Sequence, residues 1–212
     1  CSVDAISASA PTSSEVSAAT PSRVDAPSRC SSQIVAKAPT DSYTRMAESI
    51  TKTAIGDKPV YGLRVGVPNE DDEDPPRPQI MVFATQHARE WAATEVTLRL
   101  LTFLADSLPL RPGGAALLAS RDVWVIPVAN PDGYQYSGAT NRYWRKNRRD
   151  GHGVDLNRNW SGAWGGAGSS RNERSDIYRG AHAFSEPETA ALRDLAKRER
   201  IAVHLDFHTY GQ

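Results

Sequence analysis

The feature that most constrains the fold is a set of three short runs rich in apolar residues, separated by longer helical segments. The runs cover residues 80–85, 123–129 and 202–208, and each has the length of a strand rather than of a helix. The stretches 91–108 and 185–200 have helical character. Strands rich in Val and Ile that alternate with helices are typical of a sheet covered on both faces. We therefore expect an α/β fold, with a mixed, mostly parallel sheet and helices on both faces.

Other elements are expected around this framework. Residues 46–50 suit a short helix, and residues 60–67 alternate like a strand. The sequence Asn-Pro-Asp-Gly at 130–133 is a strong turn signal. The stretch 134–183 reads as loop because it is rich in Gly, Asn, Arg and Trp. The second long helix is expected to be capped by Ser185, as part of a capping box.

Residues 1–40 differ in composition from the rest of the chain. They are rich in Ser, Ala, Thr and Pro, and they contain too few large apolar residues to offset the entropy of ordering. We expect a disordered tail or tether, whose Cys1 and Cys30 could form one disulfide. A chain that begins with Cys1 and a Ser/Ala-rich stretch resembles a bacterial lipoprotein after removal of its signal peptide, and an arbitrary fragment boundary is the even alternative. An acylated Cys1 would be a lipid anchor, so a secreted or cell-envelope location is expected.

The charge balance excludes some classes of partner. Lys plus Arg and Asp plus Glu number 25 each, which gives a formal net charge of zero and a pI of about 7.1. Such a balance favours neither nucleic acid nor an acidic membrane surface. No apolar run approaches the roughly 18 residues that cross a bilayer. We expect a monomer that has no transmembrane segment and does not bind nucleic acid.

Polar side chains with metal-binding chemistry follow the predicted strands. His87 and Glu90 come after the first strand, residues 130–133 after the second, and His208 closes the third. Ligands gather at the carboxyl ends of the strands in such a sheet, so these side chains indicate a site at one edge. A lone His-x-x-Glu is more often a polar turn than a metal site. Two histidines and one glutamate, however, form one of the ligand sets of catalytic zinc.

Two carboxylates are candidates to support these ligands. Asp155 could accept a hydrogen bond from the free ring nitrogen of His87 and so fix its tautomer. Asp206 and His204 share strand parity with His208. We interpret Asp206 as a supporting carboxylate and His204 as structural.

A cluster of basic residues lies between the candidate ligands. Five of them fall within eight positions: Arg142, Arg145, Lys146, Arg148 and Arg149. Taken alone, the cluster resembles a nucleic-acid patch, but it lacks the pattern of an RNA-binding module and the chain is neutral overall. Recognition of a carboxylate by an arginine fork, with bidentate geometry, is the better interpretation.

Five segments, in this order along the chain, carry a resemblance to a known family. They are QHAREW (86–91), ANPDGY (129–134), NRYWRKNRR (141–149), VDLNRNW (154–160) and DFHTYGQ (206–212). The segments resemble those of the zinc metallocarboxypeptidases of the carboxypeptidase A/B type. The resemblance is specific from about residue 80 to residue 212, loose over 43–67 and absent over 1–40. The two-histidine, one-glutamate set is the one known from carboxypeptidase A itself, so it comes with the resemblance.

The resemblance implies a zinc-dependent exopeptidase, which removes C-terminal amino acids from peptides by attack of a zinc-bound water. It implies one zinc ion held by His87, Glu90 and His208. Arg145 is similar to the arginine that polarises the scissile carbonyl and stabilises the oxyanion. The implied substrate-binding residues are Asn157 and Arg158, which grip the terminal carboxylate, and Arg89 and Tyr210, which line neighbouring subsites. Peptide or protein C-termini are therefore the expected partners.

The chain also departs from the family pattern. The family's general base is a glutamate well downstream of the third zinc ligand, and the sequence given ends at Gln212. We therefore expect residues 41–212 to form the N-terminal portion of a catalytic domain, incomplete at the C-terminus and with an open, apolar sheet edge. Two functional classes stay open: a zinc carboxypeptidase, and a non-catalytic relative that binds zinc and peptide C-termini. A zinc amidase acting on other acyl-amino-acid bonds is a more distant third, because Asn157 and Arg158 favour peptide C-termini.

Overall fold

A computed structural model describes residues 44–53, 57–67 and 77–209, so the predicted tail, Cys1 and Tyr210 lie outside the described residues. The strands are β1 (Thr44–Lys52), β2 (Pro59–Val65), β3 (Gln79–Ala84), β4 (Asp122–Ile126) and β5 (Ile201–Phe207). The α-helices are α1 (Trp91–Thr102), α2 (Gly114–Ser120), α3 (Pro131–Ala139) and α4 (Pro187–Arg198).

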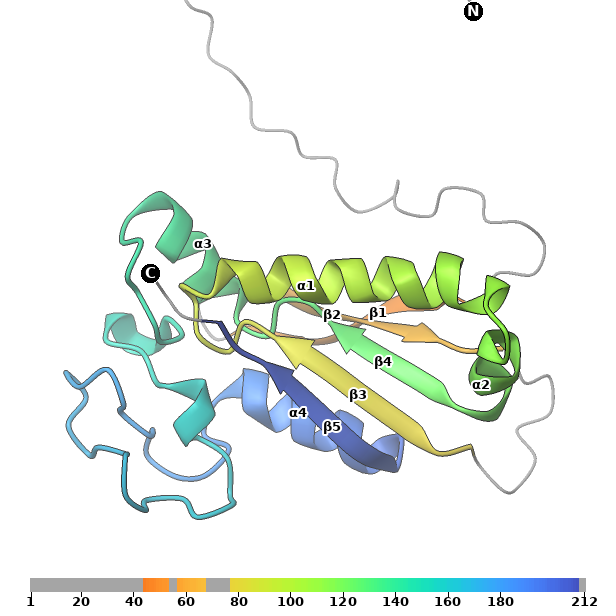
Figure 1. Cartoon of the computed structure of the whole chain (residues 1–212). Helices are drawn as coiled ribbons and strands as arrows, with labels where there is room; N and C mark the ends of the chain where they lie inside the picture. Colours follow the sequence, from red (N-terminus) through yellow and green to blue (C-terminus); the bar gives the residue numbers. More distant parts are fainter. Residues whose placement is uncertain (1–43, 54–56, 68–76, 210–212) are drawn as a thin grey trace, which may run out of the picture. The chain divides into compact units, whose positions relative to one another are not determined.

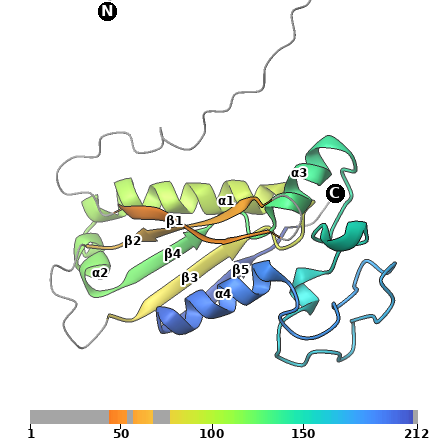
Figure 2. The same ribbon diagram turned by 180° about the vertical axis from the view of Figure 1, so that it is seen from behind.

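The five strands form one mixed sheet in the order β1-β2-β4-β3-β5 (Figures 1 and 2). β3 pairs in parallel with β4 and β5, whereas β2 pairs antiparallel with β1 and β4. The predicted fold class is confirmed. The three parallel strands bring their carboxyl ends to one edge of the sheet, which is where ligands bind in folds of this kind.

Alternate residues of the central strands enter two separate cores, one on each face of the sheet. On one face, Phe83 of β3 lies in a cluster with Leu192 and Leu195 of α4. On the other face, Val82 lies in a cluster with Leu118 of α2. Views from opposite sides show α4 across one face and α1 along the other (Figures 1 and 2). Because both faces are covered, consecutive residues of β3 and β4 can be apolar.

Two of the predicted elements are wrong. The short helix expected at 46–50 is part of β1, which pairs with β2 along its length. Strand pairing overrides a weak local helix propensity. The turn expected at 130–133 opens a helix instead, because the side chain of Asn130 accepts a hydrogen bond from the Gly133 N–H and Pro131 occupies the first turn. Asn followed by Pro is as good a helix start as it is a turn.

The helix boundaries also differ from the predictions. The long predicted loop loses its first residues to α3, and α2 was not predicted. α4 begins at Pro187 with Glu186, rather than Ser185, at its N-cap, and no side chain caps it. The Ser185 hydroxyl donates to Glu186 and accepts from Asn159 instead. A π-helical and a 3-10 segment follow α1 and continue to Leu110. None of the described helices is long and apolar enough to cross a membrane.

One edge of the described sheet is formed by β5, which pairs with β3 alone among the described strands. Its Val203 and Leu205 side chains are 52% and 49% exposed, so this edge is apolar, as expected. The carboxyl end of β5 leads directly to His208 at the candidate site.

Two buried glutamates lie at the start of α4. Glu186 and Glu188 are each 1% exposed, and the Asn147 amide donates to Glu186 Oε2 at 2.7 Å and to Glu188 Oε2 at 3.3 Å. Arg149 pairs with Glu186 at 2.7 Å. Burial, with repulsion from Glu186, raises the pKa of Glu188 to about 7. A pKa raised in the folded state means that the charged form of Glu188 opposes folding.

We expect Glu188→Gln to stabilise the protein at pH 8 but not at pH 5. Because the pKa of Glu188 is raised, its side chain does not lower the free energy of unfolding at acidic pH. As the pH rises through about 7 the buried carboxyl group ionises, and the free energy of unfolding falls. The shift corresponds to at most about 3 kcal/mol. Urea unfolding followed by tryptophan fluorescence at both pH values measures this gain. Glu95→Gln, on the exposed face of α1, is the control. An equal free energy of unfolding for Glu188→Gln and the wild type at pH 8 would contradict the prediction.

Candidate metal centre

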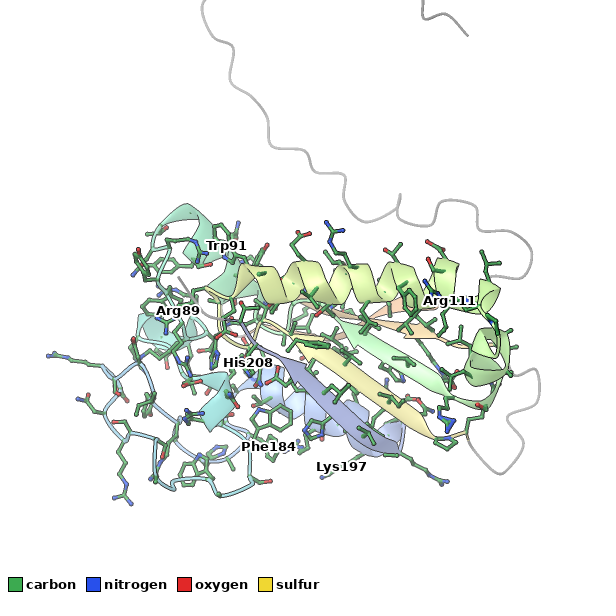
Figure 3. The ribbon with its side chains drawn as sticks, viewed as in Figure 1. Arg89, Trp91, Arg111, Phe184, Lys197 and His208 are labelled. Carbon is green, nitrogen blue, oxygen red and sulfur yellow. The ribbon has the colours of Figure 1, made fainter. Side chains whose placement is uncertain are left out.

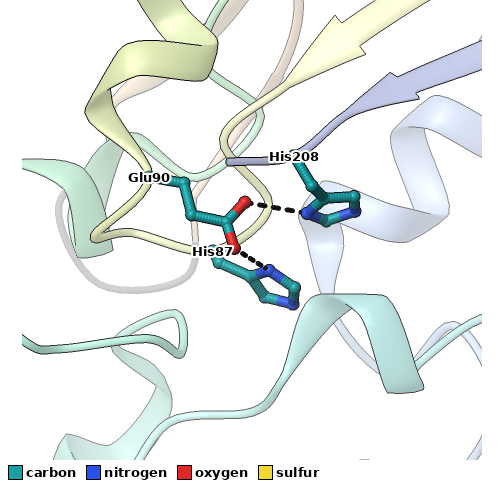
Figure 4. A group of neighbouring side chains, drawn as sticks. All are labelled: His87, Glu90 and His208. Carbon is teal, nitrogen blue, oxygen red and sulfur yellow. Dashed lines mark hydrogen bonds and ion pairs between the residues drawn. The ribbon is translucent and has the colours of Figure 1, made fainter. Parts of the chain in front are cut away.

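Three side chains predicted as metal ligands converge at the carboxyl ends of β3 and β5 (Figure 4). His87 Nδ1 lies 2.8 Å from Glu90 Oε1, and His208 Nδ1 lies 2.8 Å from Glu90 Oε2. One ligand atom from each of the three residues lies within 4.8 Å of the others. The glutamate therefore lies between two imidazole rings that both present Nδ1 to it.

The turn after β3 explains how two residues so close in sequence face the same side. Thr85 is β-branched yet adopts a φ of 60°, a conformation that costs about 1–3 kcal/mol. Its hydroxyl is held by Thr94 Oγ1 at 2.6 Å and by the Pro127 carbonyl at 3.3 Å. The Glu90 N–H then donates to the His87 carbonyl at 3.1 Å, which closes the turn just before α1. Strain in the backbone is thus located directly beside the candidate ligands.

The electrostatics of the centre favour an ionised glutamate. Burial by itself raises the pKa of Glu90, but hydrogen bonds from His208 and His87 outweigh it and bring the pKa down to about 2. Hydrogen bonds to Asp206 and Glu90 raise the pKa of His208 to about 9. The Glu90 carboxylate is therefore ionised, which is the form that binds a metal ion.

The surroundings of the centre fit a bound metal. Among the described residues, the buried polar side-chain atoms without a hydrogen-bond partner include His87 Nε2, Asp206 Oδ1 and Thr209 Oγ1. Unsatisfied buried polar atoms mark places where a ligand, ion or water is expected. Two imidazole nitrogens with one carboxylate are a donor set that suits zinc. The residues present thus fit a zinc ion.

Asp155 links the centre to the basic segment, residues 141–149. It is fully buried, and its Oδ2 accepts from Arg145 Nε at 3.1 Å and Nη2 at 3.0 Å. Its Oδ1 accepts from the Asn157 N–H at 3.0 Å. Burial raises the pKa of Asp155, but the nearness of His87 and Arg145 outweighs this and leaves the pKa below its usual value.

The expected hydrogen bond between Asp155 and the free nitrogen of His87 is not formed. His87 Nε2 lies 3.3 Å from Asp155 Oδ1, an ion-pair distance, but it has no hydrogen-bond partner of acceptable geometry. The carboxylate instead accepts hydrogen bonds from Arg145 and from the Asn157 N–H. The predicted neighbour is therefore correct, but the predicted hydrogen bond is a close contact instead.

The structure brings the other predicted residues to the centre in different degrees. Asn157 Nδ2 lies 3.3 Å from His208 Nε2, so this amide touches a candidate ligand. Arg158 donates to the Gly168 carbonyl at 2.8 Å and to the Asn157 carbonyl at 3.1 Å. Arg89 and His208 lie at the same end of the sheet (Figure 3), and Arg89 donates to a backbone carbonyl of the basic segment at 3.2 Å.

One polar residue beside the centre was not singled out from the sequence. Gln86 directly precedes His87, is 1% exposed and contacts Asp206. Its type gave no signal, since most glutamines are exposed. Its position between a buried strand and a candidate ligand was the signal that could have identified it.

Comparisons with known proteins show which family the chain belongs to. A family model described as zinc carboxypeptidase matches residues 37–212. Metallocarboxypeptidase A of Arthroderma otae is 39% identical over 145 residues, which are 64% of this chain and 34% of that protein. Carboxypeptidase A4 of Mus musculus is 32% identical over 179 residues, 80% of this chain and 42% of that protein. The carboxypeptidase A structure from Helicoverpa armigera matches with a TM-score of 0.68 at 34% identity, over 78% of this chain and 41% of that one. The chain thus spans about a third to two-fifths of the length of these relatives.

Proposed function

We propose, from the premise that this chain belongs to the zinc carboxypeptidase family, that its protein holds one zinc ion and removes C-terminal amino acids from peptides. The observation that carries the proposal is the convergence of His87, Glu90 and His208, with one ligand atom from each within 4.8 Å of the others. Zinc, when bound, polarises carbonyl groups and lowers the pKa of water.

Arg145 is proposed to stabilise the negative charge that develops on the scissile carbonyl oxygen. Its guanidinium is mostly buried, and its Nε and Nη2 both donate to Oδ2 of Asp155. The other carboxylate oxygen of Asp155 lies 3.3 Å from His87 Nε2. Because Asp155 bonds to Arg145 and also contacts the candidate ligand His87, the Arg145 guanidinium has a fixed position relative to the metal. Such fixed donors are effective because they need no reorganisation during the reaction, and the loss of one typically costs about 10²–10³ in rate.

Recognition of the terminal carboxylate is proposed for Asn157 and Arg158. The Asn157 amide lies against His208. Within the part of the chain that the structure describes, Arg158 bonds to backbone carbonyls, which are neutral partners that a carboxylate could replace. Arg89 and Tyr210 are proposed to line neighbouring subsites. The preferred partners would then be peptides or proteins with a free C-terminus.

We expect Arg158→Met to weaken binding of peptides with a free C-terminus and to leave binding of C-terminally amidated peptides unchanged. Hydrogen bonds to a charged group contribute about 1.5–3 kcal/mol, so the loss should be about 10–100-fold. Fluorescence anisotropy of labelled peptides with the zinc-loaded protein measures this difference. Arg174→Met, in the same loop but exposed, is the matched control. Equal losses for both kinds of peptide would rule out the carboxylate role.

Hydrolysis itself is tested by the release of a free amino acid from peptides blocked at the N-terminus. The proposal expects release one residue at a time from the C-terminus, with loss of activity on chelation and recovery with zinc. Binding of free C-termini without any release would instead support the non-catalytic relative. Release of internal fragments would contradict both.

We further propose a secreted or cell-envelope location. The support is the Ser/Ala/Thr/Pro-rich composition of residues 1–40. Fractionation of cells from the native source, with detection of the protein by immunoblot, tests this location, and recovery in the cytoplasmic fraction alone would contradict it.

A further inference from the structure

A second polar connection reaches the candidate metal centre through Gln86. This side chain is 1% exposed, and both ends of its amide are used. Its Oε1 accepts from Trp160 Nε1 at 2.8 Å, and its Nε2 donates to Asp206 Oδ2 at 2.5 Å. The same oxygen of Asp206 lies 2.5 Å from Nε2 of His208. A chain of hydrogen bonds thus runs from an indole on one side to a candidate ligand on the other.

The direction of each hydrogen bond in this chain is fixed by chemistry. An indole N–H can only donate, so the atom of Gln86 that faces Trp160 must be the oxygen. The amide nitrogen then faces Asp206, which as a carboxylate can only accept. His208 must therefore donate from Nε2. Its Nδ1 donates to Glu90 in the structure described, and when a metal takes the place of that proton the lone pair of the neutral ring lies on Nδ1. That is the nitrogen which lies 2.8 Å from Glu90, where the ligand atoms converge.

The Trp160 indole, at the start of this chain of hydrogen bonds, is held firmly by aromatic neighbours. Trp160 is stacked on Phe83 at 5.9 Å and 26°, and on His204 at 6.2 Å and 10°. Phe184 packs against it edge-on at 5.6 Å. The indole N–H therefore has a fixed direction, and the Gln86 amide cannot rotate without losing this hydrogen bond.

The Asn157 amide approaches the same nitrogen of His208. Its Nδ2 lies 3.3 Å from His208 Nε2, farther than Asp206 Oδ2. Amide orientation is assigned from the hydrogen-bond network, and a rotation of the Asn157 amide would present its oxygen to the His208 N–H. This contact is therefore compatible with a donating Nε2.

We propose that Gln86 is a positioning residue which, through Asp206, fixes the ring orientation and tautomer of His208 so that Nδ1 faces the metal. The inference rests on the proposed zinc-binding function and adds a residue to it. Partners in the second layer around a metal typically change its affinity by about 10–100-fold.

The test is the zinc affinity of Gln86→Met, measured by competition with a chromogenic chelator. Methionine fills a similar volume but cannot hydrogen-bond, so we expect zinc binding about 10–100-fold weaker than in the wild type. Gln79→Met is the matched control: Gln79 is the first residue of β3, is buried, and accepts from Trp124 Nε1 at 2.9 Å. It stands at the opposite end of β3, so its variant should bind zinc as the wild type does.

A second measurement reports the tautomer itself. In ¹⁵N NMR spectra of the zinc-loaded wild type, His208 should show a protonated Nε2, and Gln86→Met should show loss or exchange of that signal. If Gln86→Met does not fold, Trp160→Phe keeps the ring stack and removes the donor, and the same weakening is expected. Wild-type affinity in the folded variant, or equal losses in Gln86→Met and Gln79→Met, would overturn the inference. Absence of stoichiometric zinc in the wild type would instead overturn the proposed function.

Discussion

His87→Ala is expected to abolish stoichiometric zinc binding. The substitution removes one of three converging ligands and leaves Glu90 and His208, which are too few for a stable zinc site. Structural zinc sites supply about 10–16 kcal/mol from four ligands, so the loss of one ligand should cost about 3 kcal/mol, or more than a hundredfold in affinity. The loss should be complete at micromolar zinc after dialysis against a weak chelator.

The measurement is the zinc content per chain of the dialysed protein, together with the affinity from chelator competition. His182→Ala is the control, because this histidine is exposed and its Nδ1 lies 3.0 Å from the carbonyl oxygen of the neighbouring Ala183. The control should retain one zinc per chain. Full zinc retention in His87→Ala would remove this residue from the ligand set and would require another donor in its place.

The strands near the site could be predicted from the sequence because their pattern reports burial directly. Residues 80–85 and 123–129 are apolar at consecutive positions, and both faces of β3 and β4 are indeed covered. β1 could not be predicted in the same way, since its strand character comes from pairing with β2. Local propensity is a weak guide wherever such tertiary contacts decide the structure. The helix start at Pro131 was missed because the same residues suit a turn.

The candidate ligands could be named from the sequence because their segments resemble those of zinc metallocarboxypeptidases and follow strand ends, and the structure brings the three side chains together. The hydrogen bonds around these ligands could not be predicted from the sequence. Whether Asp155 bonds to His87 or to Arg145 depends on the orientation of one buried carboxylate, and local sequence contains no information on that angle. Gln86 was overlooked for a similar reason, since its partners Asp206 and Trp160 lie far away in the sequence.

Asp155 is the residue whose loss should combine effects on stability and on zinc. Its carboxylate is fully buried, pairs with Arg145 and lies 3.3 Å from His87. Breaking a buried ion pair by removal of one partner typically costs about 3–5 kcal/mol, because it leaves the other charge uncompensated. We expect Asp155→Asn to destabilise the fold by an amount of this order and to weaken zinc binding by about 10–100-fold. Asp150→Asn, exposed and at a φ of 49° that asparagine tolerates, should change neither property.

A double-mutant cycle separates the ion pair from other roles of Asp155. If the cost of Asp155→Asn arises from an uncompensated Arg145, then Arg145→Met should relieve it, and the double variant should be more stable than additivity predicts by about 1–3 kcal/mol. Zinc affinity should not recover in the double variant, because the contact with His87 remains altered. Additive losses in the free energy of unfolding would show that the cost of Asp155→Asn does not arise from the loss of its ion pair with Arg145. Recovery of zinc affinity would show that Arg145, and not His87, connects Asp155 to the metal.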